Sequence, residues 1–248
     1  GFCVLLAGSS DTNEKTNIQK WWSDLYRQLY DGHEAGATAE TMEENMVQVE
    51  DLFRKRRLLA VEEMPLHDVE GKRVLEIGPG GGAHSAVFKK HGASVVAVDI
   101  TAERVAATAR KLALIGNGEG RAYQADGENL PFRDDSFDIV YSNGVLHHSE
   151  NTDTCIAEVR RVLKPGGKAV IMLYSRHSTT YWLNVVPRAI VTGEMFRRPE
   201  AEWIGRLTEG KPKHGDTKNR YTRVYSEREL RHLFRDFKVL SLRKNSFQ

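Results

Sequence analysis

Val74-Leu75-Glu76-Ile77-Gly78-Pro79-Gly80-Gly81-Gly82 is the stretch that decides the fold of this 248-residue chain. A short apolar run, typical of a buried strand, leads directly into a glycine-rich turn, and a helical pattern over 83–90 follows at once. Glycine tolerates the unusual backbone angles of such a turn, and its lack of a side chain lets the backbone approach a ligand closely. Backbone N–H groups at the start of the next helix favour a carboxylate or a phosphate. The stretch therefore predicts a strand, a ligand-binding loop and a helix.

Short apolar and β-branched runs alternate with helical patterns on both sides of the loop. Strands are expected at Arg73–Ile77, Ser94–Ile100, Arg121–Ala125, Phe137–Ser142 and Lys168–Tyr174. Helices are expected at Ala83–Lys90, Ala102–Leu114 and Thr152–Leu163. Strands that alternate with helices form βαβ units with right-handed crossovers and parallel strands. The expected fold class is α/β, a doubly wound, mostly parallel Rossmann-like sheet with helices on both faces.

The segments that flank this core predict two additions. Residues 1–65 are expected to form an N-terminal helical segment that covers the ligand site, with its second helix at Thr41–Glu63. Residues 66–248 are expected to form the main domain. Within it, 176–225 has weak periodicity and several glycines, which predicts a lid or cap inserted before the last helix.

The C-terminal part predicts a helix and one more strand. Ser226-Glu227-Arg228-Glu229 has the form of a capping box and opens a helix through Phe237, and a strand is expected at Lys238–Leu242. Beyond Lys238–Leu242 the pattern supplies no convincing further strand. A further strand is either missing from the chain or supplied by Phe2–Ala7.

Composition limits the classes of function. The net charge is +2, from 36 basic and 34 acidic residues, which gives no general reason to expect a nucleic-acid partner. Cys3 and Cys155 are the only cysteines, too few for a disulfide framework or a four-thiolate metal site, and no metal is expected. No apolar run approaches the roughly 18–20 residues that cross a bilayer. A cytoplasmic location is expected, and the oligomeric state stays open.

An acid follows the glycine loop at an informative distance. Asp99 ends the second expected strand, 21 residues after Gly78 (99 − 78 = 21). A carboxylate at the tip of that strand can accept both hydroxyls of a ribose, so a nucleoside ligand is expected. These features leave the nucleotide open, because Gly78, Gly80 and Ala83 also fit the dinucleotide-binding pattern.

Four motifs downstream of Asp99 indicate which nucleotide ligand is expected. They are Ala125-Asp126-Gly127-Glu128-Asn129-Leu130-Pro131-Phe132, Ser136-Phe137-Asp138-Ile139-Val140, Ser142-Asn143-Gly144-Val145-Leu146-His147-His148 and Arg161-Val162-Leu163-Lys164-Pro165-Gly166-Gly167. With the glycine loop and Asp99, their order resembles the class I S-adenosylmethionine-dependent methyltransferases, in particular the ubiquinone/menaquinone-biosynthesis and small-molecule group. The resemblance covers residues 70–175 well and 226–242 weakly.

The resemblance implies S-adenosylmethionine as cofactor and S-adenosylhomocysteine as its product. The implied cofactor-binding residues are Glu76, Gly78, Gly80, Gly82, Asp99, Ile100, Asp126, Gly127, Glu128, Asn143 and Val145. The three glycines would line the methionine moiety, and Glu76 would anchor its amino group. Asp99 would bind the ribose, with Ile100 against the adenine.

The remaining implied contacts concern the two ends of the cofactor. Asp126 would accept the exocyclic amine of the adenine, with the backbone of Gly127 and Glu128 at the ring edge, and Asn143 and Val145 would face the sulfonium. Separately from the resemblance, Tyr26 and Tyr30 on the N-terminal helix are candidates to close over the cofactor. An aromatic stripe at helical spacing more often packs in a core.

Methyl transfer needs a general base only where the acceptor has a proton to lose. His147 and His148 are the catalytic candidates, because they follow the fourth strand at the sheet edge where ligands bind and because histidine titrates near neutrality. A structural role for either histidine stays open. The expected partner is a small-molecule acceptor of the methyl group.

Two further interpretations stay open. The cations within 197–223 would suit a nucleic-acid or protein methyltransferase, although interspersed acids favour a solvated lid. A non-enzymatic binding module is the other, and the intact glycine loop, Asp99 and Asp126 argue against it.

Overall fold

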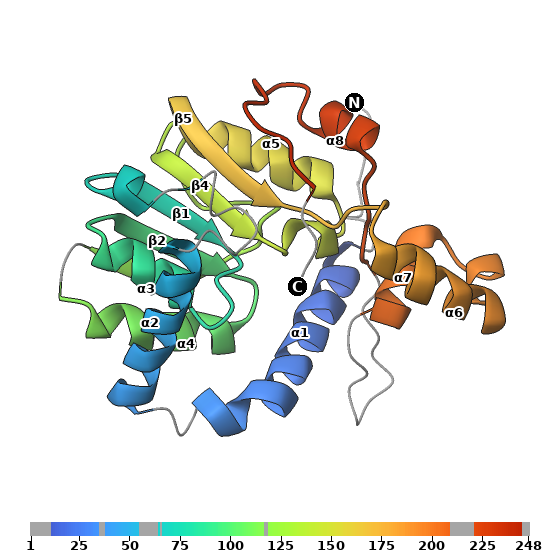
Figure 1. The fold of residues 1–248 in the computed structure, drawn as a ribbon, viewed down its shortest axis with the longest axis horizontal. Coiled ribbons are helices and arrows are strands. Elements are labelled where there is room, and N and C mark those ends of the chain that lie inside the picture. The colour runs from blue at the N-terminus through green and yellow to red at the C-terminus, as the bar shows by residue number, and fades with distance from the viewer. Residues whose placement is uncertain are drawn as a thin grey trace, which may run out of the picture.

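The computed structural model describes residues 11–34, 38–54, 64, 66–116, 119–208 and 221–244. At its centre lies a five-stranded, all-parallel sheet in the order β3-β2-β1-β4-β5 (Figure 1). The strands are β1 (Arg73–Ile77), β2 (Ser94–Asp99), β3 (Gly120–Gln124), β4 (Phe137–Asn143) and β5 (Leu163–Met172). The expected doubly wound parallel sheet is confirmed.

Helices cover both faces of this sheet (Figure 1). One face packs against α2 (Ala39–Arg54), α3 (Ala83–Lys90) and α4 (Ala102–Leu114), and the other against α5 (Thr152–Val162) and α8 (Glu227–Leu233). Successive strand residues alternate between the two layers: Val74 joins a buried cluster with Phe88 and Leu112. Leu75, its neighbour, joins the opposite cluster with Val159. Both layers are apolar because a parallel sheet is buried on both faces.

The order of the strands creates a crevice between β1 and β4. The chain runs outward from β1 through β2 to β3, then returns to the other side of β1 and continues to β5. Right-handed crossovers therefore place α3 and α4 on one face and α5 on the other. The loops that leave the carboxyl ends of β1 and β4 turn in opposite directions, which is where open α/β sheets bind ligands.

Two helical additions flank this carboxyl edge. The long helix α1 (Asp11–Glu34) crosses it and contacts α4 (Figure 1). Beyond β5, a π-helical turn η3 (Tyr181–Val185), α6 (Val186–Val191), η4 (Glu194–Phe196) and α7 (Glu200–Thr208) form a unit that we call the cap, residues 181–208. The cap has its own apolar cluster, in which Tyr181 and Ala189 pack with Trp203 and Ile204.

Three expectations about boundaries are wrong. β5 begins at Leu163 and not at Lys168, because Leu163 pairs with Phe137 and an irregularity in register then accommodates the intervening Pro165-Gly166. The helix that Ser226 caps ends at Leu233 and not at Phe237. The strand expected at Lys238–Leu242 is absent from the described structure, where these residues are exposed and pair with no strand.

Other expectations fall partly outside the described residues. The second N-terminal helix is observed from Ala39 to Arg54, and the remainder of its expected range, 55–63, lies outside them. Phe2–Ala7 also lies outside them. Within the part of the chain that the structure describes, no helix combines the length and the apolar character needed to cross a membrane.

Candidate functional site

A cleft lies at the carboxyl ends of β1 and β4 and consists of two adjoining chambers. The first extends toward the ends of β2 and β3, where Asp99, Ile100 and Asp126 line it. The second lies beside the glycine loop. Both chambers share the side chains and backbone of Trp22, Tyr26, Gly78, Gly144, Val145 and His148. A single elongated ligand could therefore occupy both.

The three glycines of the loop have different structural roles. Gly78 has a φ of 73°, and a Cβ atom there would lie 2.3 Å from Cγ2 of Val145, across the cleft. Gly80 also has a positive φ, 55°, but a Cβ would meet nothing within 4 Å, and the residue lines the second chamber. At Gly82 a Cβ would lie 2.6 Å from the Cα of Thr108, on α4. Gly80 thus borders open space in the site, whereas Gly82 permits two helices to pack.

Glu76 lies at the end of β1, buried beneath the loop and lining the second chamber. Its Oε2 accepts a hydrogen bond from the hydroxyl of Ser85, and its Oε1 lies 3.7 Å from Nδ1 of His84. Burial raises the pKa of Glu76 to about 7 and lowers that of His84 to about 4. A buried carboxylate in this position is stabilised by a cationic group in the chamber.

Asp99 ends β2 and is oriented by the residue two positions later. Its Oδ1 accepts hydrogen bonds from the backbone N–H of Thr101, at 2.9 Å, and from the Thr101 hydroxyl, at 2.8 Å. Burial raises the pKa of Asp99 above its ordinary value. The structure thus fixes a carboxylate in the wall of the first chamber, with Ile100 beside it.

Asp126 follows β3 and is held in an unexpected ion pair. Its Oδ1 accepts from the backbone N–H of Glu128 at 2.9 Å, which closes a local turn. Its Oδ2 lies 2.9 Å from Nζ of Lys15, on α1, and the same Nζ lies 3.1 Å from Oε2 of Glu128. Burial opposes the charge of Lys15, but hydrogen bonds to the two carboxylates raise its pKa above the ordinary value. All three residues, together with Gly127, line the first chamber.

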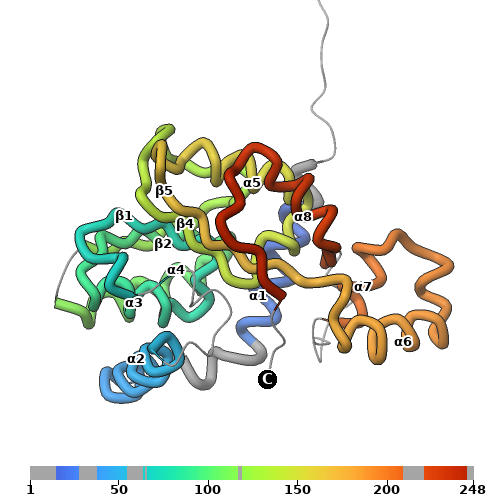
Figure 2. Tube along the Cα trace, turned by 45° about the horizontal axis from the view of Figure 1, so that its top comes forward, coloured from blue at the N-terminus to red at the C-terminus, as the bar shows by residue number. Residues whose placement is uncertain are grey.

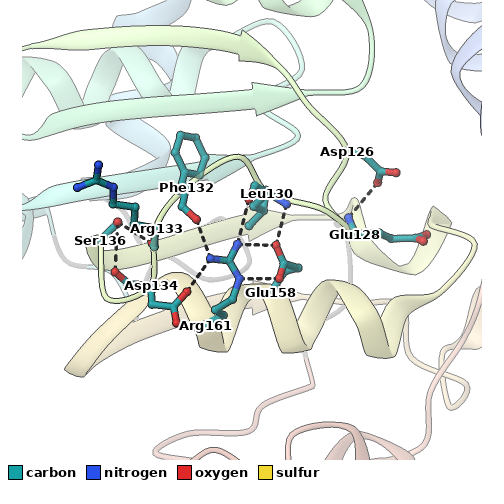
Figure 3. Close-up of polar contacts among 9 residues, drawn as sticks. All are labelled: Asp126, Glu128, Leu130, Phe132, Arg133, Asp134, Ser136, Glu158 and Arg161. Atoms are coloured by element: carbon teal, nitrogen blue, oxygen red, sulfur yellow. Dashed lines mark hydrogen bonds and ion pairs between the residues drawn. The ribbon is translucent and has the colours of Figure 1, made fainter.

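The loop that carries Asp126 is braced from α5 (Figure 3). Arg161 donates to the carbonyl oxygens of Leu130 and Phe132, at 2.9 and 2.6 Å, and its guanidinium also contacts Glu158 and Asp134. Glu158 in turn accepts from the backbone N–H of Leu130 at 2.8 Å. Backbone carbonyls in a loop without regular structure need such donors. Arg161 and Glu158 therefore set the path of the chain that leaves Asp126.

Helix α1 forms one wall of both chambers. Ile18, Trp22 and Tyr26 line the cleft, and the Trp22 and Tyr26 rings stack at 5.6 Å. The Arg104 guanidinium, from α4, lies 3.7 Å above the Tyr26 ring, a cation–π contact that holds the helix against the core. The side chain of Tyr30 lies outside the described part of the chain.

Asn143 and Val145 lie where β4 ends, at the junction between the chambers. Oδ1 of Asn143 is buried and has no hydrogen-bond partner in the described part of the chain, although the residue lines the second chamber. A buried acceptor without a partner is costly unless a ligand or water satisfies it. The chamber therefore offers an acceptor to a polar or cationic ligand.

The two adjacent histidines occupy different environments. His148 lines both chambers and contacts Trp22 edge to face, with 5.2 Å between the ring centroids. His147 is fully buried behind it, 3.9 Å from the ring centroid of Tyr174, and its ring nitrogens have no hydrogen-bond partner among the described residues. Burial lowers the pKa of both, that of His148 to about 4. Both rings are therefore neutral at pH 7.

The chain segment that follows the cap orients His148. Nδ1 of His148 lies 3.3 Å from the carbonyl oxygen of Tyr221 and 3.1 Å from the hydroxyl of Thr222, which is fully buried. A carbonyl oxygen only accepts, so the contact with Tyr221 requires the proton of the neutral ring on Nδ1. Nε2 then has the lone pair that a proton acceptor needs.

The residues present fit an adenosyl sulfonium amino acid. Carboxylates stand at the ends of β1, β2 and β3, and an unsatisfied acceptor and aromatic faces stand at their junction. Carboxylates can accept from an ammonium, a ribose and a purine amine, and aromatic faces attract a cationic sulfur.

The sequence did not identify several residues of this arrangement. Lys15 is an isolated cation at the start of a helical pattern, and Thr222 and Arg161 contact residues far away in the sequence. No local spacing could have found these pairs, because each depends on the tertiary fold.

Comparisons with known proteins find similarity to methyltransferases. Residues 75–171 match the family model described as a methyltransferase domain. Over 107 residues the chain is 38% identical to the demethylmenaquinone methyltransferase of Clavibacter sepedonicus, a match that covers 43% of each protein. It is 35% identical over 111 residues to the malonyl-[acyl-carrier protein] O-methyltransferase of Pectobacterium atrosepticum, which covers 45% of this chain and 40% of that one.

The chain thus spans less than half the length of these two relatives. Among solved structures, a SAM-dependent methyltransferase from Methanosarcina mazei aligns with a TM-score of 0.53 at 25% identity, over 69% of this chain and 82% of that chain. The matched sequence contains the glycine loop, Asp99, Asp126 and both adjacent histidines.

Proposed function

We propose that the chain transfers a methyl group from S-adenosylmethionine to a small-molecule acceptor, because residues 75–171 match a methyltransferase-domain model and belong to a parallel, Rossmann-like sheet with its ligand cleft at the carboxyl edge. The observation that carries the proposal is the line of carboxylates formed by Glu76, Asp99 and Asp126 along one continuous cleft. The relatives named above act on a demethylmenaquinone and on a malonyl-acyl carrier protein. Because these two acceptors differ, we propose for this chain a class of acceptor, a small molecule, and we name neither a particular compound nor the atom that is methylated.

The cofactor's adenosine belongs in the first chamber and its methionine in the second. Asp99 accepts from the ribose, beside Ile100, and Glu76 binds the ammonium, whose charge stabilises this buried carboxylate. The contact with Lys15 uses only part of the Asp126 carboxylate, which has about four acceptor positions. Asp126 can therefore also accept a hydrogen bond from the adenine amine.

The contacts that the family resemblance implies for Asn143 and Val145 are proposed at the sulfonium end of the cofactor. The methyl group bound to positive sulfur is the electrophile that the cofactor supplies. Asn143 and Val145 face this end, and aromatic rings of Trp22 and Tyr26 exclude water from it. Exclusion of water and alignment of the acceptor accelerate an in-line displacement.

His148 is the better of the two candidates for general base. It lines the cleft, and its Nδ1 contacts leave Nε2 as the proton acceptor, whereas His147 lines neither chamber among the described residues. A base is used where the acceptor is a hydroxyl or another protonated nucleophile. The proposed role of His147 is structural, as a buried ring that packs against Tyr174.

The proposal includes the organisation of the chain. Residues 1–65 form a helical segment whose α1 covers the cofactor, and residues 66–248 form the methyltransferase domain, with the acceptor beneath the lid within 176–225. A cytoplasmic location belongs to the same proposal.

The alternative, a nucleic-acid or protein acceptor bound by the basic 197–223 segment, has less support. Arg198 and Arg206 pair with acids inside the cap, and Arg223 donates to the carbonyl oxygens of Ser149 and Glu150. The charges of Arg198 and Arg206 are already paired with carboxylates, which weakens their contribution to phosphate binding, and the two carbonyl oxygens direct Arg223 toward the loop after β4.

A transfer experiment separates the two. The full chain is incubated with S-[methyl-³H]adenosylmethionine and a cell extract, which is then divided into small molecules, protein and nucleic acid. With the cofactor below saturation, we expect label in the small-molecule fraction with the unmodified chain and at least about tenfold less with Asp99→Asn. Label confined to protein or nucleic acid would contradict the proposed acceptor class, and no transfer into any fraction would contradict the activity.

A further inference from the structure

The outer face of the cap exposes apolar side chains that belong to no buried cluster of the described structure. Leu183, Val191 and Phe196 are exposed to 79%, 87% and 77%, and Trp182 and Ile190 are also exposed. The cap lies at one end of the molecule, and α6 is its outermost part in both views (Figures 1 and 2). We propose that this face, formed by the five exposed apolar residues together with Arg188 and Arg197, docks on an anionic lipid surface.

The arrangement of residues along η3 and α6 separates two apolar surfaces. Val185, Val186 and Ala189 point inward and complete the cluster with Trp203. The exposed residues Leu183, Ile190 and Val191 recur at intervals of seven and one, which places them together on the opposite surface of a helix. The outer surface is therefore not needed to close the cap's own core. Apolar surface that is not needed for the fold marks an interaction site.

The charges around this face are positive. The three acidic residues in the described cap are each engaged with basic partners: Glu194 pairs with Arg198 and Arg206, Glu202 with Arg198, and Glu200 with Arg176. Arg188 and Arg197 stand on the exposed surface beside the apolar residues. Arg188 donates to the carbonyl oxygen of Leu207, which leaves its charge unneutralised. Cations beside aromatic and aliphatic side chains are typical of a surface that lies in a bilayer interface.

This distribution favours lipid over a second copy of the chain. A two-fold dimer would place the same face against itself, so Arg188 and Arg197 of both copies would lie in one interface and bring like charges together. The described cap has no unengaged acid on this face to compensate them. An anionic headgroup layer supplies both the negative charge and the apolar depth.

The test measures binding of the full chain to vesicles by co-sedimentation. Vesicles of equal parts phosphatidylcholine and phosphatidylglycerol are compared with vesicles of phosphatidylcholine alone. We expect binding to the anionic vesicles, and Arg188→Gln/Arg197→Gln to weaken it by about fivefold for each charge removed. Leu183→Ser/Val191→Ser is expected to weaken it by at least about tenfold.

A matched control replaces the same residue types elsewhere. Val47→Ser/Leu240→Ser removes one exposed valine and one exposed leucine, on α2 and in the C-terminal segment, and should leave vesicle binding unchanged. All four replaced side chains are exposed, so the thermal unfolding midpoint should stay constant in both double variants.

Three outcomes would overturn the proposal. The first is absence of binding to the anionic vesicles, and the second is equal loss of binding in Leu183→Ser/Val191→Ser and in Val47→Ser/Leu240→Ser. The third is a dimer in lipid-free solution, seen by light scattering, that Leu183→Ser/Val191→Ser dissociates, because the face would then join two copies. Each outcome is independent of methyl transfer.

Discussion

Alanine at Gly78 and at Gly80 should have different consequences, although both glycines lie in one loop and have positive φ angles. A left-handed conformation costs a residue with a Cβ about 1–2 kcal/mol. Alanine also lowers the conformational entropy of the unfolded chain, which offsets about 0.4–1 kcal/mol of this cost. For Gly80→Ala, where the added Cβ meets nothing within 4 Å, we therefore expect a loss of about 1 kcal/mol in the free energy of unfolding.

Gly78→Ala adds a steric conflict to the same strain. The new Cβ would lie 2.3, 2.6 and 2.8 Å from the Cγ2, Cγ1 and Cβ atoms of Val145. Overpacking of this kind costs about 1–3 kcal/mol, so we expect a total loss of about 3 kcal/mol. Val145→Ala removes the two nearest atoms. The double variant should consequently recover most of the stability that overpacking removes. The coupling free energy between the two positions should be about 2 kcal/mol.

Urea denaturation gives the free energies of unfolding, and calorimetry gives S-adenosylmethionine affinity for the folded variants. We expect Gly80→Ala to weaken the cofactor by about tenfold despite its small effect on stability, because its Cβ projects into the second chamber. Equal stability of the two alanine variants, or no coupling between Gly78 and Val145, would refute the steric argument. Full affinity in Gly80→Ala would refute the placement of the ligand.

Three further predictions concern His148, Glu76 and the braced loop. Thr222→Val should lower turnover by about tenfold at unchanged cofactor affinity, because one of the two groups that orient His148 is lost. Thr222→Ser keeps the hydroxyl and should retain activity. Equal loss of turnover in both variants would argue against orientation by the hydroxyl. Burial raises the pKa of Glu76 from 4.5 to about 7, so its contribution to stability is present below pH 4.5 and lost as the pH rises through 7. Relative to Glu76→Gln, the unliganded protein should lose about 3 kcal/mol over that range in urea denaturation, and parallel pH profiles would contradict this. Arg161→Met should lower the free energy of unfolding by about 2 kcal/mol and weaken cofactor binding, because the carbonyl oxygens of Leu130 and Phe132 lose their donor. An unchanged denaturation midpoint would show that these hydrogen bonds do not stabilise the loop.

The parts of the fold that the sequence predicted depend on local periodicity. Strands and helices of the core were predicted because apolar residues such as Val74 and Leu75 follow each other without interruption, as a sheet buried on both faces requires. The end of β2 at Asp99 and the helix cap at Ser226 were local signals of the same kind.

The failures have one physical cause, which is that tertiary contacts decided the outcome. The run at Lys238–Leu242 is rich in apolar residues, as a strand is, but pairs with no strand in the part of the chain that the structure describes. Pro165-Gly166 reads as a turn before β5, yet pairing with β4 starts the strand at Leu163. The ion pair of Lys15 with Asp126 joins positions that lie far apart in the chain, so no spacing rule reaches it.

The central claim is that the carboxylate of Asp99 binds the ribose of S-adenosylmethionine, and calorimetry of the full chain with this cofactor tests it most directly. Asp99→Asn keeps an oxygen for the two Thr101 hydrogen bonds but removes the charge, and Asp236→Asn is the control at an exposed position. Hydrogen bonds to charged groups contribute about 1.5–3 kcal/mol, so we expect affinity to fall by about tenfold or more in Asp99→Asn and to stay constant in Asp236→Asn. Binding of equal strength in Asp99→Asn and the unmodified chain, or no binding by either, would contradict the account.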